Sequence, residues 1–198
     1  MDHFEYFRAR YGLRPEDVNF FPYGSRVYGT ASEQSDYDYI AIIPAERRSD
    51  TGTEFNWNNV NIHMFNQYDW QQQLNRHKIH TLEVYFFFVC YRKMFNFKLD
   101  RFILRNELMA KSRHSFIRAK KKIEVEKEFI LGWKSLFHSL RILVFGTQLV
   151  KMGKIADYSA ANHYWFDIRN SQITQWDLLK EKYEPEHKKL LKEFLRKD

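Results

Sequence analysis

Short apolar runs separated by polar turns fill the first half of the chain. Residues 18–23 and 37–43 are rich in aromatic and β-branched side chains, which predicts two strands, the first ending at Gly24-Ser25. Residues 60–65 alternate apolar and polar positions and predict a third strand. Apolar residues at helical spacing predict helices over residues 2–11, 26–31, 69–76 and 81–92.

The second half has helical periodicity almost to its end. The predicted helices cover residues 116–131, 135–150, 158–168 and 173–195. Gly153 follows Lys151-Met152 as a C-terminal stop. The pattern predicts an α+β half followed by a helical half, with a boundary near residue 98 that no Pro/Gly linker marks.

Composition narrows the class of protein. The 198 residues are 44% hydrophobic, which excludes a disordered chain. The formal charge is +7, from 32 Lys+Arg against 25 Asp+Glu. Such a balance favours polyanionic partners such as nucleic acid or nucleotide phosphates, although solubility alone also explains it.

Cysteine content and apolar runs indicate the compartment. The single cysteine, Cys90, excludes a disulfide framework, and its apolar neighbours predict a core position. The apolar stretch of residues 84–91 is too short to cross a bilayer, and no signal peptide is recognisable. We therefore expect a cytoplasmic protein without a membrane partner.

Residues 24–38 contain a pattern that is typical of a phosphate- and metal-binding site. Gly24 and Ser25 follow a strand and open a helical turn, which presents backbone N–H groups and a hydroxyl to a phosphate. Ten residues separate Ser25 from Asp36, and Asp36 and Asp38 stand two apart at the start of a strand. Both carboxylates then project from one face, where their repulsion favours a cation such as Mg²⁺ or Mn²⁺ between them.

This pattern resembles the signature of the DNA polymerase β-like nucleotidyltransferase superfamily. It is most similar to predicted nucleotidyltransferases of that superfamily in residues 24–30, which read G-S-R-V-Y-G-T, and 35–38, which read S-D-Y-D. Residues 75–86 and 132–153 also resemble that family, so the likeness covers most of the chain.

The resemblance implies a fold and an activity. Residues 1–98 would form a catalytic domain with a mixed sheet and flanking helices, and residues 99–198 a helical domain packed against it. The implied reaction is Mg²⁺-dependent transfer of a nucleoside monophosphate from a nucleoside triphosphate (NTP) to a hydroxyl, with release of pyrophosphate.

The resemblance also implies roles for individual residues. Ser25 would hold the β- and γ-phosphates, with Gly24 and Arg26 in the same nucleotide-binding segment. Asp36 and Asp38 would be the catalytic residues that bind the metal ions.

The chain departs from the superfamily at the third carboxylate, which is expected on the neighbouring strand. Residues 58–65 contain no acid; Asn59, Asn61 and His63 alternate where the carboxylate is expected. Asn cannot take a proton, whereas His63 could act as the base. An acid close in space would restore the enzyme interpretation, and the candidates are Glu54, Asp69 and Glu83. Without one, the chain would be a degenerate nucleotide- or RNA-binding regulatory module.

Basic residues in the helical half offer a second contact with phosphates. Lys134, His138 and Arg141 stand at i, i+4 and i+7 and could hold a triphosphate or an RNA backbone, or simply form a solvated face. The resemblance favours phosphate binding for Lys134 and Arg141 over a solvated face. The run at residues 118–122 lies beside Glu124, Glu126 and Glu128, so salt bridges within the helix are its favoured role.

The sequence leaves the class of molecule that supplies the acceptor hydroxyl undecided. The positive charge favours an RNA or DNA end, a protein acceptor is possible, and a small molecule ranks third. A helical adaptor would leave the segment of residues 25–38 unused.

Overall fold

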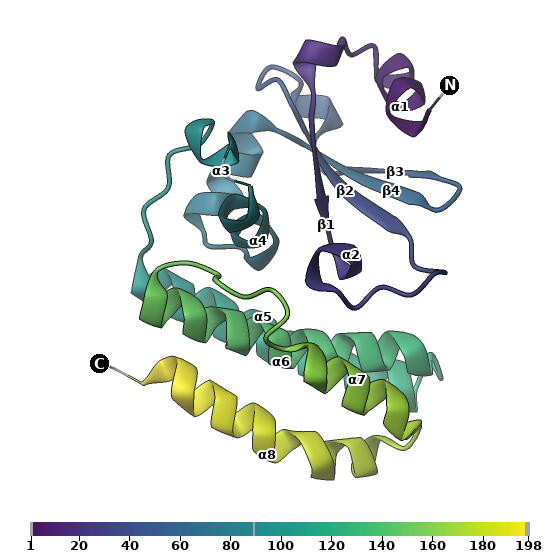
Figure 1. The fold of residues 1–198 in the computed structure, drawn as a ribbon, viewed down its shortest axis with the longest axis vertical. Helices are drawn as coiled ribbons and strands as arrows, with labels where there is room; N and C mark the ends of the chain where they lie inside the picture. The colour runs from purple at the N-terminus through teal and green to yellow at the C-terminus, as the bar shows by residue number, and fades with distance from the viewer. Residues whose placement is uncertain (1, 89, 197–198) are drawn as a thin grey trace. The chain divides into compact units, whose positions relative to one another are not determined.

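A computed structural model describes residues 2–88 and 90–196 (Figure 1). Its contacts divide the chain into two compact units, Met1–Lys98 and Leu99–Asp198. The first unit is a sheet with helices and the second is helical, so the expected α+β class is confirmed.

The first unit contains a four-stranded mixed sheet in the order β1-β2-β4-β3. β2 and β4 are parallel, whereas β1–β2 and β3–β4 are antiparallel. The strands are β1 (Asn19–Tyr23), β2 (Tyr37–Ile43), β3 (Thr53–Trp57) and β4 (Val60–Asn66). The helices are α1 (His3–Tyr11), α2 (Ser25–Tyr28), α3 (Gln67–Asn75) and α4 (Ile79–Phe87).

The sequence pattern missed strand β3. Thr53, Phe55 and Trp57 alternate with polar residues, and Asn58 has the left-handed φ of 53° that a tight hairpin turn needs. Alternation before an Asn-Asn pair was the available signal. The hairpin places β3 antiparallel to β4 and leaves β4 to pair with β2.

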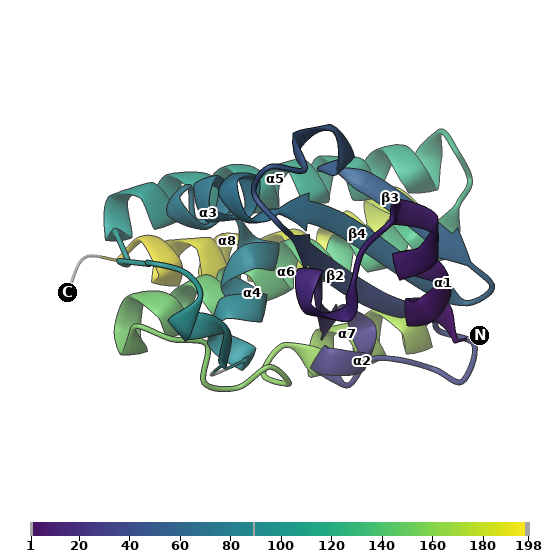
Figure 2. The same cartoon turned by 90° about the horizontal axis from the view of Figure 1, so that it is seen from above.

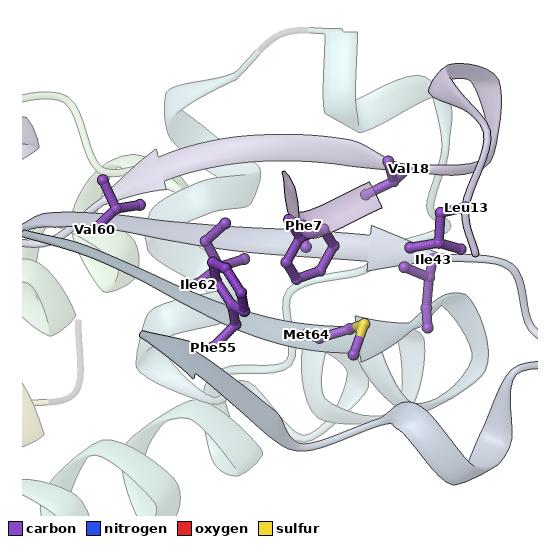
Figure 3. Close-up of a cluster of buried hydrophobic side chains, with 9 residues drawn as sticks. Phe7, Leu13, Val18, Ile43, Phe55, Val60, Ile62 and Met64 are labelled. Carbon is purple, nitrogen blue, oxygen red and sulfur yellow. The ribbon is translucent and has the colours of Figure 1, made fainter. Parts of the chain in front are cut away.

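One face of the sheet is a hydrophobic core covered by α1. Phe7 of α1 is fully buried among side chains of β2, β3 and β4 that share this face (Figure 3). The cluster comprises Phe7, Leu13, Val18, Ala41, Ile43, Phe55, Val60, Ile62 and Met64. An apolar face of this size determines the register, because a slip by one residue would expose all of it.

Within the first unit, α3 and α4 cover one end of the opposite face. In both ribbon views α1 and the α3–α4 pair lie on opposite sides of the sheet (Figures 1 and 2). Phe65 of β4 packs against Trp70 of α3 and His80 of α4, and Phe21 of β1 packs against Phe88. The other end of this face carries polar side chains.

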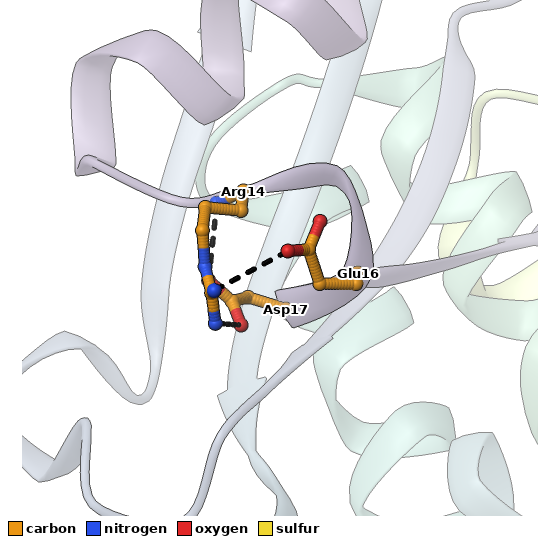
Figure 4. Close-up of polar contacts among 3 residues, drawn as sticks. All are labelled: Arg14, Glu16 and Asp17. Carbon is orange, nitrogen blue, oxygen red and sulfur yellow. Dashed lines mark hydrogen bonds and ion pairs between the residues drawn. The ribbon is translucent and has the colours of Figure 1, made fainter.

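An exposed ion pair shapes the connection between α1 and β1. The Arg14 guanidinium donates to both carboxylate oxygens of Asp17 at 2.9 Å and lies 3.3 Å from Glu16 (Figure 4). The hydrogen bond from Arg14 lowers the pKa of the Asp17 carboxyl below its usual range. The contacts close the 3-10 turn η1 (Pro15–Asp17), from which the chain enters β1.

The second unit is a set of packed helices. They are α5 (Arg101–Glu124), α6 (Phe129–Met152), α7 (Asn162–Ser171) and α8 (Trp176–Leu195). The chain breaks between α5 and α6 at residues 125–128, inside a segment predicted as one helix over 116–131. Helix α5 also begins earlier than predicted, where the Asp100 side chain accepts hydrogen bonds from the backbone N–H groups of Phe102 and Ile103.

Helix α6 is long and apolar enough to cross a membrane by length and composition, but most of it is buried in the fold. Leu136, Leu140, Leu143 and Phe145 are completely buried, as in the core helix of a bundle.

Cys90 is exposed, so the predicted core position for it was wrong. It lies in the short turn η3 (Cys90–Lys93) after α4, where no helix continues.

Candidate functional site

The polar end of the sheet face opposite α1 brings together side chains from all four strands. Tyr23, Asp38, Asn61 and Asn56 occupy neighbouring positions of β1, β2, β4 and β3 in the register. Residues that pair across a sheet project from the same face. Asp38 therefore lies within a polar row at the start of β2, before the apolar residues of that strand.

Gly24 brings the chain against this row. Its φ of 80° is left-handed, and a Cβ built on it would lie 2.6 Å from Oδ2 of Asp38. Only glycine allows the backbone to turn this close to the carboxylate. Ser25 follows Gly24 in this turn, and the Ser25 hydroxyl makes no hydrogen bond with any other residue of 2–88 or 90–196.

Helix α2, which begins at Ser25, is a single turn. The N–H groups of Val27 and Tyr28 donate to the Gly24 carbonyl at 3.1 and 3.2 Å. Because α2 is so short, its dipole is smaller than that of a longer helix. The phosphate-binding capacity of this turn therefore rests on Ser25 and the first backbone N–H groups.

Arg26 connects α2 to the segment that carries the acids. Its Nη2 donates to the Ser35 carbonyl at 2.6 Å and its Nε to the Asp36 carbonyl at 3.3 Å. The guanidinium also lies 3.7 Å from the centre of the Tyr37 ring. Arg26 thus holds the backbone around exposed Asp36, and its contact with a nucleotide stays a prediction.

Asn61 lies beside Asp38 in the register and is one of the three residues, with Asn59 and His63, among which the sequence predicts the place of the third carboxylate. Its Nδ2 donates to Oδ1 of Asp38 at 3.2 Å. Asn59 lies in the turn before β4, where its carbonyl accepts from the Tyr37 N–H at 2.7 Å. The spacing along the chain did not show which of the two asparagines lies beside Asp38. The strand pairing shows it, because β4 starts at Val60 and Asn61 is the residue opposite Asp38.

None of the candidate acids stands beside Asp38 in the register. Glu54 of β3 lies opposite His63 of β4, and its Oε1 is 3.3 Å from Nδ1 of that imidazole. Asp69 binds Asn66 at the far end of β4. Glu83 of α4 is buried and accepts a 2.6 Å hydrogen bond from the Tyr28 hydroxyl. Glu54 and His63 therefore form an acid–base pair on the same face of the sheet as Asp38.

The pKa of Tyr23 is raised by burial and by negative charges at this polar end. Burial raises the pKa of its phenol well above the usual range, and the negative charges of Asp38, Glu54 and Glu83 raise it further. Its ring meets His63 edge to face, 5.9 Å between centroids. These carboxylates make the surroundings of Tyr23 a region that favours a cation.

Binding of Mg²⁺ by Asp36 and Asp38 stays a prediction. Asp36 and Asp38 supply hard oxygen ligands, and Mg²⁺ prefers one or two carboxylates completed by phosphate oxygens and water. Among the residues that the structure describes, no three His, Cys, Asp or Glu side chains gather as a metal site. The described residues therefore offer Asp36 and Asp38 as the carboxylates for the predicted metal ion, without a third ligand grouped beside them.

The three basic residues predicted on α6 have different surroundings. Lys134 is exposed and His138 is half-buried, whereas Arg141 is buried. Arg141 Nη2 lies 3.0 Å from Nδ1 of His138, and its guanidinium lies within 6 Å of the Phe137 and Phe145 ring centres. The second unit thus holds Arg141 in its own packing, and phosphate contacts of these residues stay predictions.

Comparison with known proteins gives one structural similarity. The scan against protein-family models and the search of curated proteins found no match. The solved structure of a nucleotidyltransferase-like protein from Exiguobacterium sibiricum is similar over 95% of this chain and 73% of its own, with 12% identity and a TM-score of 0.37. A similarity of this degree assigns neither substrate nor activity to the chain.

Proposed function

We propose that the first unit binds an NTP with Mg²⁺ or Mn²⁺ and transfers its nucleoside monophosphate to a hydroxyl. The observation that carries the proposal is the contact of Gly24 with Asp38, because it brings the Ser25 turn and the acidic strand start together. A phosphate on Ser25 and a cation on Asp36 and Asp38 would then be neighbours.

Each residue has a role in this proposal. Ser25 would bind the β- and γ-phosphates, while Asp36 and Asp38 would hold the metal ion. The bound ion supplies charge neutralisation for the triphosphate. The acceptor oxygen forms a bond to the α-phosphorus, the bond to the bridging oxygen breaks, and pyrophosphate leaves.

The acceptor proton needs a base, and His63 is the candidate. Its Nδ1 faces Glu54 at 3.3 Å, which would hold the imidazole in the tautomer whose Nε2 accepts a proton. His63 lies two residues beyond Asn61 on the same face of β4. It would therefore replace the missing third carboxylate as proton acceptor.

The acceptor class is proposed from charge. The net charge of +7 favours an RNA or DNA end over a protein acceptor, with a small molecule third. Lys134, His138 and Arg141 are proposed as additional phosphate contacts.

A second candidate is nucleotide binding without transfer. Asn61 favours it, because an amide bonded to Asp38 can neither take a proton nor add a negative charge for a second metal ion. The unit would then act as a nucleotide- or RNA-binding regulatory module.

Labelled nucleotides test both candidates. The full chain would be incubated with each of the four α-³²P-labelled NTPs, Mg²⁺ or Mn²⁺, and total RNA. We expect label to be transferred to RNA or protein and transfer to be lost in Asp36→Asn/Asp38→Asn. The exposed Asp177→Asn in α8 is the matched control and should transfer normally.

Asn61→Asp separates the candidates. Placing a carboxylate beside Asp38 should raise the transfer rate about 100-fold or more, within the usual range for a positioned base. Wild-type binding of NTP without transfer, combined with transfer by Asn61→Asp, would establish the binding module. Neither metal-dependent NTP binding nor transfer in any variant would exclude both.

A further inference from the structure

The positive charge of the protein is concentrated in one helix. Residues 108–123 of α5 contain six Lys and Arg and no Asp or Glu, a net charge of +6. The whole chain carries +7, so the other residues together carry only +1. The excess charge is therefore a local feature of the second unit.

The cations of α5 lie on its exposed side. The buried side consists of Leu104, Leu108, Ser112, Ser115, Ala119 and Ile123. The exposed side carries Lys111, Arg113, His114, Arg118, Lys120 and Lys121, which we call the basic face. Ile117, which is 67% exposed, lies among them.

The basic face is extended along the helix. Lys111, His114, Arg118 and Lys121 follow one another at i, i+3, i+7 and i+10, which aligns them in one stripe. The stripe is about 15 Å long at 1.5 Å per residue. A row of cations of this length can contact consecutive phosphates of one nucleic-acid strand.

Only some of the cations on the basic face form ion pairs with acidic residues of the protein. Lys120 pairs with Glu124 at 3.6 Å and Lys121 with Glu126 at 3.1 Å, as the sequence pattern favoured. Lys111, Arg113 and Arg118 form no ion pair with another residue of the described chain. Exposed ion pairs are weak, so Lys120 and Lys121 can also exchange their partners for phosphates.

A membrane surface fits this face less well than a nucleic acid. Amphipathic helices bind membranes by inserting an apolar face, and the apolar side of α5 is buried within its own unit. What remains exposed is a row of cations with Ile117 among them, and such a row suits a linear polyanion.

We propose that the basic face of α5 binds the phosphate backbone of single-stranded nucleic acid. The proposal goes beyond nucleotidyl transfer, because binding at this face needs neither Ser25 nor the two carboxylates of the first unit. It would supply sequence-independent affinity with a strong dependence on salt.

Fluorescence anisotropy tests the proposal without NTP or Mg²⁺. The full chain is titrated into a labelled 20-nucleotide single-stranded RNA of mixed sequence at several KCl concentrations. We expect Lys111→Gln/Arg113→Gln/Arg118→Gln to weaken binding at least 10-fold. The slope of log affinity against log salt should fall by about 2, at about 0.7 per lost phosphate contact. This variant removes no ion pair of the described chain, and circular dichroism checks its fold.

A control with the same net charge makes the result specific. Lys154→Gln/Lys180→Gln/Lys192→Gln also removes three exposed cations and should change affinity less than twofold. Equal losses in both variants, or unchanged binding by the first, would overturn the proposal. So would tight binding to vesicles containing phosphatidylserine with no binding to RNA. Asp36→Asn/Asp38→Asn should bind RNA normally, which keeps this test separate from the proposed transfer.

Discussion

At the scale of single residues, Asp38 is the centre of the candidate site. The Gly24 backbone turns against its Oδ2, and the Asn61 amide donates to its Oδ1. One carboxylate oxygen therefore faces the Gly24 turn, and the other accepts a hydrogen bond from Asn61 of β4. A substitution at either neighbour should act on the site through Asp38.

Gly24→Ala tests the close approach to Asp38. The left-handed φ and the 2.6 Å contact should together lower the free energy of unfolding by about 2–4 kcal/mol. Gly52→Ala is the matched control, because Gly52 has a φ of 76° with nothing within 4 Å of the added Cβ. It should cost only about 1 kcal/mol. Urea unfolding measures both, and equal losses would show that the contact is not restrictive.

At the scale of elements, the α5–α6 pair shows how one glycine permits close helix packing. A Cβ on Gly132 of α6 would lie within 3 Å of two side-chain carbons of Ile123 in α5. The chain leaves α5 at Val125 and re-enters a helix at Phe129, so the two residues meet just beyond the connection. The break that the apolar periodicity did not reveal is what creates this pair.

Gly132→Ala should destabilise the second unit by about 1–3 kcal/mol through overpacking, although alanine is the better helix former. The reason is specific to Ile123. In an Ile123→Ala background the same substitution should therefore become neutral or stabilising by up to about 1 kcal/mol. Thermal unfolding of the four proteins measures the coupling, and an additive result would contradict the close contact.

At the scale of the whole molecule, a buried histidine makes stability depend on pH. His187 of α8 lies against α5, with Nε2 2.9 Å from the Ser112 hydroxyl oxygen. Burial lowers the pKa of His187, nearby Arg113 lowers it further, and Glu184 opposes the shift. The folded state thus takes up a proton less readily than the unfolded state.

Stability should fall as the pH drops below about 6.5, the usual histidine pKa, until the lowered pKa of the folded state is reached. The slope from this group is at most about 1.4 kcal/mol per pH unit. His187→Gln should flatten it, whereas the exposed His114→Gln should leave it unchanged. Urea unfolding between pH 5 and 8 makes the comparison, and identical slopes in all three proteins would exclude His187 as the cause.

The sequence by itself determined the α+β class, the β2 strand at residues 37–43 and the spacing from Ser25 to Asp38. These depend on local side-chain periodicity and turn chemistry, which neighbouring residues carry. The sequence also located the charge, because the run without acids is continuous.

Only the tertiary structure decided which residues meet. The β2–β4 register places Asn61 rather than Asn59 beside Asp38, and the β3 hairpin places Glu54 against His63. The burial of Arg141 likewise depends on the helices around it. Such contacts join residues far apart in the chain and arise from strand pairing and core packing, which no local pattern encodes.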